Sequence, residues 1–254
     1  MANFYHKLIS TDHILPVLDE VRAVKKPWEL AAIKRGAQIL ERVFTWVRFC
    51  AVAGRTEQQI ARDIARIMKR NGAEALAFPV IVASGPGAAD IHHIPTKRKV
   101  RKGDILMIDC GAVVKGHCSD CTRTFFIGHP SQRFIRYYQE VLKAQERAIA
   151  KIRHGIAAKV VDRAARGYLA RWRWGKTFTH GCGHGVGLAI HEFPNLKPKS
   201  RDVLKAGMVV TVEPGIYLKR WGGIRIEDMV LVRRGGSKII TRSIPKQFEQ
   251  IILS

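Results

Sequence analysis

The sequence carries an internal repeat, and this repeat limits the fold more than any other feature. Residues 102–111 read KGDILMIDCG, and residues 206–215 read AGMVVTVEPG. The two segments align at a constant offset of 104 residues, which places Asp109 on Glu213. A repeat of this length predicts two related structural units, one built from each half of the chain.

Two further matches follow along the chain. An H-x-x-P segment begins at His92 and again at His191, 99 residues later. Asp120 has a counterpart in Glu227, 107 residues later. Each half therefore supplies one histidine and two carboxylates in the same order. Halves packed about a pseudo-two-fold axis would bring these side chains together at their shared centre.

Both halves are predicted to form helices and then short strands, from the spacing of apolar residues and from turn signals. Pro27 is typical of a first helical turn, and Thr56 begins a capping box for a second helix. The predicted helices run from Pro27 to about Val47, Thr56 to Asn71, about Ser131 to His154, and Val160 to about Gly175. The predicted strands are residues 80–83, 105–109, 122–127, 208–212 and 224–232.

The repeat also indicates the domain organisation. A length of 254 residues is enough for one large domain with a substantial core. Residues 1–26 show little periodicity and are expected to form an N-terminal arm. Residues 27–254 are expected to form a single domain, with pseudo-repeats at about 27–130 and 131–254.

Four acidic residues lie within or beside the predicted apolar strands. Asp109 and Glu213 end two of these strands, Glu227 lies inside a third, and Asp120 precedes a fourth. An acid in an apolar strand costs free energy unless it is paired or bound to a metal. A single acid of this kind is explained by a capped turn or a salt bridge. Four converging acids would repel one another, and divalent cations are the simplest remedy.

The candidate imidazole ligand is His184, within the segment HGCGHGVGL at residues 180–188. The alternating glycines are interpreted as room for a metal ion and a substrate beside the ring. The segment lacks the lysine and the spacing of nucleotide-binding loops. Oxygen-rich ligation with one imidazole suits Mn²⁺, Co²⁺, Fe²⁺ or Zn²⁺, and Mn²⁺ fits so many carboxylates best. Strand alternation predicts that Arg225 faces the same side as Glu227.

This set of residues resembles the five-ligand signature of the M24 metallopeptidases, the family of methionine aminopeptidase, Xaa-Pro aminopeptidase, prolidase and creatinase. The resemblance covers about residues 27–234. It implies the α+β pita-bread fold, in which two pseudo-symmetric α/β halves surround a curved antiparallel sheet. It also implies two divalent metal ions. Asp109 would hold one ion, His184 and Glu213 the other, and Asp120 and Glu227 would bridge both.

Three local sequences are similar to the Xaa-Pro aminopeptidase and prolidase branch. They are VASGP followed by HHIPT at residues 82–86 and 92–96, GIRIED at 223–228, and TVEPGIY at 211–217. The chain is expected to be a metallo-aminopeptidase or dipeptidase that hydrolyses the N-terminal peptide bond of peptides, above all Xaa-Pro. No segment resembles the separate N-terminal domain of most Xaa-Pro enzymes. Methionine aminopeptidase, which has a similar compact length, is therefore the alternative activity.

The expected nucleophile is a hydroxide that bridges the two metal ions, since paired cations lower the pKa of a shared water toward about 7. By resemblance, Glu213 would carry a proton to the leaving nitrogen. His191 would stabilise the oxyanion, and His92 would contact the substrate near the scissile bond. Arg225 would orient the site and offset its negative charge.

The net charge of +23, from 44 basic and 21 acidic residues, is the least ordinary property of the chain. Such a charge favours contact with nucleic acid, anionic lipid or acidic partners. The simpler interpretation is a cationic surface without a dedicated partner, because the basic residues are scattered and only residues 97–102 form a dense cluster. An alternative of another class is a binding module for nucleic acid or ribosomes that retains the peptidase fold.

The remaining expectations concern environment and assembly. Five cysteines are an odd number in a chain too long to need disulfides, which indicates reduced thiols and a cytoplasmic setting. No apolar run reaches the roughly 20 residues that span a bilayer, and the first residues do not resemble a secretory signal. The expected partner is a peptide substrate, with no membrane, and a homodimer stays open.

Overall fold

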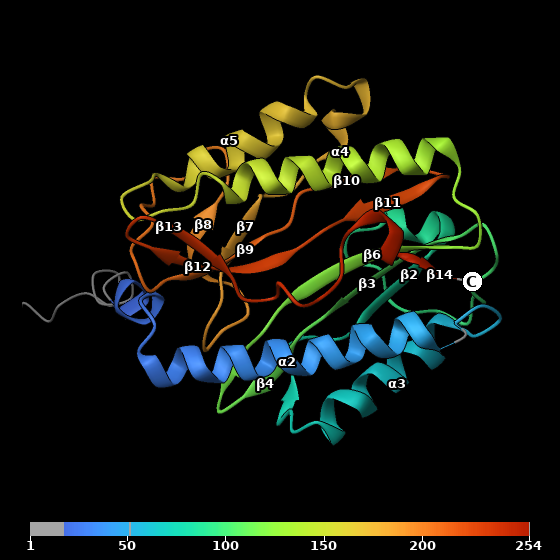
Figure 1. The fold of residues 1–254 in the computed structure, drawn as a ribbon, viewed down its shortest axis with the longest axis horizontal. Helices are drawn as coiled ribbons and strands as arrows, with labels where there is room; N and C mark the ends of the chain where they lie inside the picture. Colours follow the sequence, from blue (N-terminus) through green and yellow to red (C-terminus); the bar gives the residue numbers. More distant parts are fainter. Residues whose placement is uncertain (1–17, 51, 254) are drawn as a thin grey trace, which may run out of the picture.

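Two pairs of helices enclose the strands of the protein. The computed structural model describes residues 18–50 and 52–253 (Figure 1). Helices α2 (Pro27–Phe49) and α3 (Glu57–Arg70) lie on one side of the strands. Helices α4 (Gln132–Ile149) and α5 (Ala158–Leu169) lie on the other. Each pair comes from one half of the chain, which is the arrangement that the repeat predicts.

Each half also supplies most of one sheet, although β14, from the end of the second half, joins the sheet of the first. The first sheet has the order β14-β6-β3-β2 and the second the order β13-β12-β9-β7-β8. All pairings in these two sheets are antiparallel except that of β14 with β6. The members are β2 (Ile81–Ser84), β3 (Ile105–Cys110), β6 (Cys121–Ile127), β7 (Gly183–Gly185), β8 (Glu192–Leu196), β9 (Val209–Val212), β12 (Asp228–Arg233), β13 (Gly236–Ile239) and β14 (Ile252–Leu253).

Smaller elements complete the described part of the chain. A three-stranded sheet has the order β1-β4-β5, and β10 pairs with β11. These strands are β1 (Ala75–Leu76), β4 (Ala112–Val114), β5 (His117–Cys118), β10 (Gly215–Leu218) and β11 (Gly222–Arg225). Three short 3₁₀ helices are η1 (Gly85–Ala89), η2 (Arg173–Thr177) and η3 (Phe248–Gln250). No helix in residues 18–50 and 52–253 is long and apolar enough to cross a membrane.

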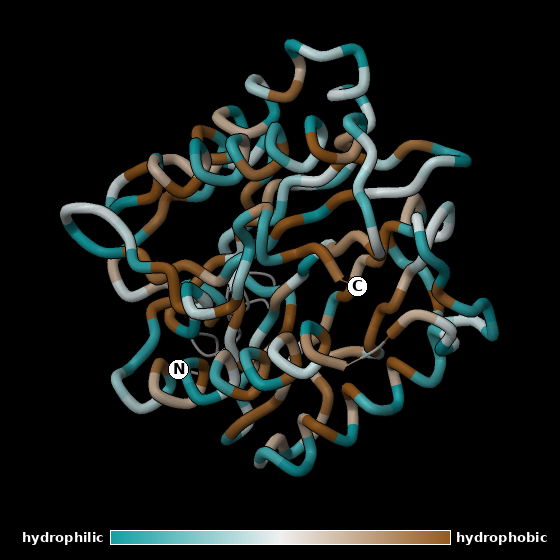
Figure 2. Tube along the Cα trace, turned by 45° about the vertical axis from the view of Figure 1, so that its right-hand side comes forward, coloured by the Kyte–Doolittle hydropathy of each residue, from teal (hydrophilic) through white to brown (hydrophobic). Residues whose placement is uncertain are grey.

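The helices form where the sequence supplies caps and one apolar face. Thr56 accepts a hydrogen bond from the backbone N–H of Gln59, which begins α3 as predicted. The apolar face of α3, with Ile60, Ile64 and Met68, is fully buried. Figure 2 shows hydrophilic and hydrophobic turns alternating along the helices, as expected for helices with one face on a core.

The predicted strand at 224–232 is wrong in one respect, because the chain changes sheets in its middle. Strand β11 ends at Arg225 and pairs with β10, whereas β12 starts at Asp228 and pairs with β9. Between them, the backbone N–H of Glu227 donates to the carbonyl oxygen of Thr122 at 3.2 Å. Glu227 is therefore anchored to the first half of the molecule at the point where the ladder is interrupted.

Two other boundaries differ from the prediction. Helix α5 ends at Leu169 instead of near Gly175, and η2 follows after a short turn. A side chain at Gly175 would lie 1.9 Å from the carbonyl oxygen of Leu169, so the chain folds back closely there. The predicted arm lies outside the described residues up to position 17, but residues 18–23 are helical and Val24 forms a β-bridge with Met208.

A buried ion pair ties the two halves together. The guanidinium of Arg123, on β6, lies 2.7 Å from the Asp228 carboxylate at the start of β12, and both side chains are fully buried. Arg123 also donates to the backbone oxygens of Ile244 and Pro245. Burial would raise the pKa of Asp228, but Arg123 and then Lys246 outweigh it and lower that pKa. The pair is therefore charged on both sides.

We expect Arg123→Met to lower the free energy of unfolding by about 3–5 kcal/mol, because the change leaves the Asp228 charge buried without its main partner. Urea denaturation followed by circular dichroism measures this. The matched control is Arg62→Met, at an exposed site on α3, which should change stability by less than about 0.5 kcal/mol. Equal losses in both variants would mean that the buried pair contributes nothing specific.

Candidate metal centre

All eight residues singled out from the sequence line one cavity of about 320 Å³. The five candidate metal ligands are Asp109, Asp120, His184, Glu213 and Glu227. The four predicted catalytic residues are His92, His191, Arg225 and Glu213, which is also a candidate ligand. The ligands come from both halves: two from the β3–β6 region, and three from β7, the end of β9 and the β11–β12 junction. The structure therefore brings together residues that are more than 100 positions apart.

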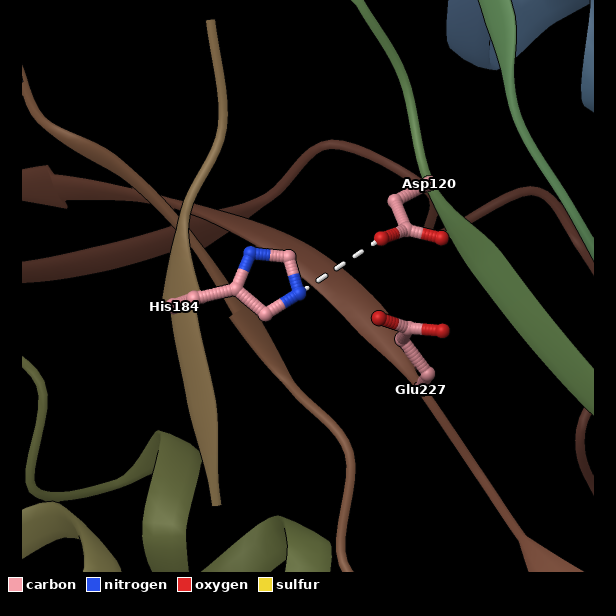
Figure 3. A group of neighbouring side chains, drawn as sticks. All are labelled: Asp120, His184 and Glu227. Atoms are coloured by element: carbon pink, nitrogen blue, oxygen red, sulfur yellow. Dashed lines mark ion pairs between the residues drawn. The ribbon is translucent and has the colours of Figure 1, made fainter. Parts of the chain in front are cut away.

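Three of the candidate ligands form a compact group. One side-chain atom each of Asp120, His184 and Glu227 lie within 4.8 Å of one another. Figure 3 shows the His184 ring pointing from its strand toward the two carboxylates. Nε2 of His184 lies 3.7 Å from Oδ2 of Asp120 and 3.4 Å from Oε1 of Glu213. These separations leave space for a cation between the side chains.

The backbone fixes which nitrogen of His184 faces the acids. Nδ1 lies 3.0 Å from the carbonyl oxygen of Gly185, so its N–H donates to that oxygen. Nε2 is then left with a lone pair directed at the carboxylates. Metal-binding histidines are commonly oriented by such a hydrogen bond on the other nitrogen.

The glycines around His184 have a different role from the one predicted. A side chain at Gly183 would lie 2.0 Å from the carbonyl oxygen of Thr211, and one at Gly185 would lie 2.2 Å from that of Phe193. The glycines thus allow β7 to pack tightly between neighbouring backbones. They position the imidazole and do not serve mainly to clear space for a ligand.

The donor set fits divalent cations. Oδ1 of Asp109 and Oδ1 of Asp120 are buried and have no hydrogen-bond partner. Buried carboxylate oxygens without a partner are costly, and a bound cation is a standard way to satisfy them. Asp109, Asp120, Glu213 and Glu227 all line the same cavity. Oxygen donors with one imidazole suit Mn²⁺ and similar ions.

The pKa values of the acids are shifted by their burial and by their closeness to one another. Burial raises the pKa of Asp120, and the negative charges of Glu227 and Asp109 raise it further. Burial, followed by the charges of Glu213 and Asp109, likewise raises the pKa of Glu227. Burial also raises the pKa of Glu213, although His180 and Arg225 act in the opposite direction. Each of these three carboxyls therefore binds a proton more tightly than an isolated carboxyl does.

Arg225 is the counter-charge inside the cavity wall. Its buried guanidinium donates to Oδ2 of Asp109 at 2.7 Å, to Oγ1 of Thr122 at 3.0 Å and to the Tyr217 hydroxyl at 3.1 Å. The Tyr217 hydroxyl also lies 2.8 Å from Nε2 of His180. Burial raises the pKa of Tyr217 to about 12, so its hydroxyl stays protonated. The predicted orienting role of Arg225 is consistent with these contacts.

The two H-x-x-P histidines lie at the open side of the cavity. His191 packs against His184 with ring centroids 4.3 Å apart, and burial followed by the His184 charge lowers the pKa of His191. A lowered pKa keeps the His191 ring neutral near pH 7, with one N–H to donate. His92 is exposed, and its backbone N–H donates to Asp90 at 3.1 Å.

The sequence pattern assigns no functional role to Glu57, which lies within the capping box that begins at Thr56. Its fully buried carboxylate accepts hydrogen bonds from the backbone N–H and hydroxyl of Ser84 and of Thr96. Nε2 of His93 lies 2.9 Å from the same carboxylate. Glu57 thus holds both ends of the segment that carries His92. Only an acid next to a helix start could have drawn attention to it, and that signal is common.

The comparisons with known proteins agree with this geometry. Residues 31–234 match metallopeptidase family M24. The chain is 37% identical to the Xaa-Pro dipeptidase of Pyrococcus horikoshii over 89% of this chain and 65% of that protein. It is 41% identical to the probable dipeptidase PepE of Mycobacterium bovis over 87% of this chain and 59% of that protein. The chain thus spans about two thirds or less of the length of these relatives.

Solved structures show the same fold. The prolidase of Thermococcus sibiricus superposes with a TM-score of 0.90 at 41% identity, over 94% of this chain and 65% of that chain. The X-Pro aminopeptidase of Thermotoga maritima gives a TM-score of 0.89 at 37% identity, over 94% and 66%. The pita-bread fold and the Xaa-Pro branch of the resemblance are confirmed. On the match to residues 31–234, this chain belongs to metallopeptidase family M24.

Proposed function

We propose that this protein hydrolyses the first peptide bond of peptides that carry proline in second position, with the aid of two divalent cations. The observation that carries the proposal is the buried acidic group with two carboxylate oxygens that lack a partner, open to a cavity of about 320 Å³. Two relatives named Xaa-Pro dipeptidase support the substrate class. All five cysteines are free thiols, which fits a cytoplasmic enzyme. The proposal holds for a monomer and for a homodimer.

The ligand roles follow the donor set. Asp109 would hold one cation, His184 and Glu213 the other, and Asp120 and Glu227 would lie between them. Mn²⁺ suits this set best, with Co²⁺, Zn²⁺ and Fe²⁺ as alternatives. Bound there, the cations would lower the pKa of a shared water toward about 7 and so supply hydroxide at neutral pH.

The protein's own side chains complete the reaction. Glu213 lines the cavity, takes the proton that the shared water loses as it becomes hydroxide, and delivers this proton to the leaving nitrogen. Neutral His191 donates a hydrogen bond to the oxygen of the scissile carbonyl, where negative charge develops. His92, at the rim, contacts the substrate beside that bond. Arg225 orients the Asp109 carboxylate through its 2.7 Å hydrogen bond.

The cavity matches an Xaa-Pro peptide at both ends. The buried acids attract the free amine of the first residue. An apolar wall, formed by Phe78, Ile91, Ile94 and Ile190, suits the ring of a prolyl residue. Ile94, at the edge of this wall, is also exposed to solvent.

A peptide panel tests the substrate class. With added Mn²⁺, we expect release of the first residue from Xaa-Pro dipeptides or Xaa-Pro-Xaa tripeptides at least about 10-fold faster than from Met-Ala-Ser, a difference of about 1.4 kcal/mol in transition-state binding. Chromatographic product analysis measures the rates. Faster cleavage of Met-Ala-Ser would contradict the Xaa-Pro proposal and favour methionine aminopeptidase.

Asp120→Asn tests the ligand roles without a change of side-chain size. We expect activity to fall by more than about 100-fold, since even outer-shell changes at metal sites cost 10–100-fold. Bound Mn²⁺, measured by elemental analysis after dialysis, should fall as well. Glu146→Gln, at an exposed site on α4, is the matched control and should retain both. Full metal content in Asp120→Asn would exclude a ligand role for Asp120.

The raised pKa values predict how pH and metal act together. Asp120, Glu213 and Glu227 bind protons more tightly when folded than when unfolded, where the carboxyl pKa is about 4. The stability of the metal-free protein should therefore fall as pH rises above about 4 through the folded pKa values. Cations replace these protons. The rise in Tm on adding Mn²⁺ should then be larger at pH 8 than at pH 5.5 in a thermal melt with an EDTA reference. An equal rise at both pH values would contradict the assignment.

A further inference from the structure

Four aromatic rings form a continuous ladder on the outer side of the second half. The aromatic ladder consists of Trp172 and Trp174 on and beside η2, Tyr137 on α4, and Trp221 in the β10–β11 turn. The rings of Trp172 and Trp174 are stacked at 5.9 Å, and Tyr137 lies 4.6 Å from Trp174 and 5.2 Å from Trp221. All four residues are half-buried, and Tyr137, Trp174 and Trp221 also pack against the hydrophobic core.

Arginines cover this ladder from α4. The Arg133 guanidinium lies 4.9 Å from the Trp221 ring and 5.3 Å from the Tyr137 ring, and that of Arg136 lies 4.5 Å from the Trp172 ring. Both arginines are exposed, and neither forms an ion pair within residues 18–50 and 52–253. A guanidinium stacked on a ring keeps its N–H groups free for an anion.

Most of the charge near the ladder is positive. Between Asp162 and Glu192 the chain has no acid but five basic residues, and the neighbouring turn adds two more. Arg166 pairs with Asp162. The other six form no ion pair among the described residues; they are Arg163, Arg171, Arg173, Lys176, Lys219 and Arg220. The nearby acid Glu140 is directed inward, where it accepts hydrogen bonds from the Tyr168 hydroxyl at 2.6 Å and from Nε1 of Trp172 at 3.2 Å. Glu140 therefore orients one ring of the ladder, and its ion pair among the described residues is with Lys143, not with Arg133 or Arg136.

We propose that this arginine-covered aromatic ladder binds single-stranded nucleic acid. Phosphates would bind the unpaired guanidinium groups, and bases would stack on the rings, the combination that single-strand-binding surfaces use. A duplex would meet only the arginines, because its bases are stacked on one another. The ladder shares no residue with the acidic cavity, so this binding is separate from hydrolysis and is tested independently of it.

The net charge of +23 alone would attract any polyanion, so the test must separate a built surface from diffuse charge. Fluorescence anisotropy with a labelled oligouridine of about 20 nucleotides gives the affinity at several salt concentrations. The double variant Arg133→Gln with Arg136→Gln should bind at least 10-fold more weakly. Its slope of log K against log salt should be shallower by about 1.4, since each lost phosphate contact on a single strand removes about 0.7.

The matched control removes the same charge elsewhere. Arg62→Gln with Arg70→Gln lies on α3, on the opposite side of the strands, at two exposed residues (Figure 1). This control should weaken binding less than twofold. If both double variants lose the same affinity, the binding is diffuse attraction and the proposal is wrong.

The rings are tested without a change of charge. Trp174→Leu should weaken oligouridine binding at least about fivefold, which is the low end for a lost base–aromatic stack, and should leave duplex binding unchanged. An equal loss on both nucleic acids would contradict stacking. Sedimentation with vesicles containing phosphatidylserine is the competing assay: binding to vesicles without binding to oligouridine would assign the surface to anionic lipid and overturn the proposal. Thermal melts of each variant show that the fold is retained.

Discussion

The convergence of buried carboxylates is the constraint on which the rest of the structure depends. Asp109, Asp120, Glu213 and Glu227 share a cavity, and burial together with repulsion from the neighbouring carboxylates raises the pKa of Asp120 and of Glu227. Only one arginine, Arg225, directly pairs with a member of this group among the described residues. One positive charge cannot balance four negative ones, so the site is incomplete as a purely protein structure. The two unpartnered oxygens are the visible result of this imbalance.

Holding such a group together requires rigid connections between the halves, and these are placed around Glu227. Its carboxylate accepts from the Thr122 hydroxyl at 2.7 Å, and its backbone N–H donates to the carbonyl oxygen of the same residue. One position further along each strand, Arg123 pairs with Asp228. The Arg123–Asp228 ion pair is thus adjacent in sequence to Glu227, an acid without a positively charged partner among the described residues. The favourable pairing of Arg123 and Asp228 keeps the strands in a position where Glu227 cannot move away from the other acids.

Much of the candidate site could be predicted from the sequence, because the repeat places the same types of side chain at matching positions in the two halves. Asp109 and Glu213 could be matched residue by residue, and their place at strand ends follows from local apolar runs. The break before Asp228 could not be predicted, since residues 224–232 alternate like one continuous strand and only pairing with two different sheets interrupts them. The hydrogen bonds of Glu57 to Ser84 and Thr96 could not be predicted from the sequence either. Its partners lie 27 to 39 residues away, and local capping explains the same acid just as well.

The charges of the molecule are divided between its inside and its outside. The cavity gathers acids, whereas the chain as a whole carries +23. The surface charges have little effect on the cavity, because exposed charges are screened over about 8 Å at physiological ionic strength. Charges inside a poorly solvated cavity interact more strongly at short range. A peptide amine is therefore attracted once it reaches the cavity mouth, even though the exterior repels it weakly at long range. A polyanion experiences the opposite: the exterior attracts it, and the acids of the cavity exclude it. Under the two proposals, one chain would therefore bind a large anion on its cationic surface without blocking the entry of a peptide amine into the acidic cavity.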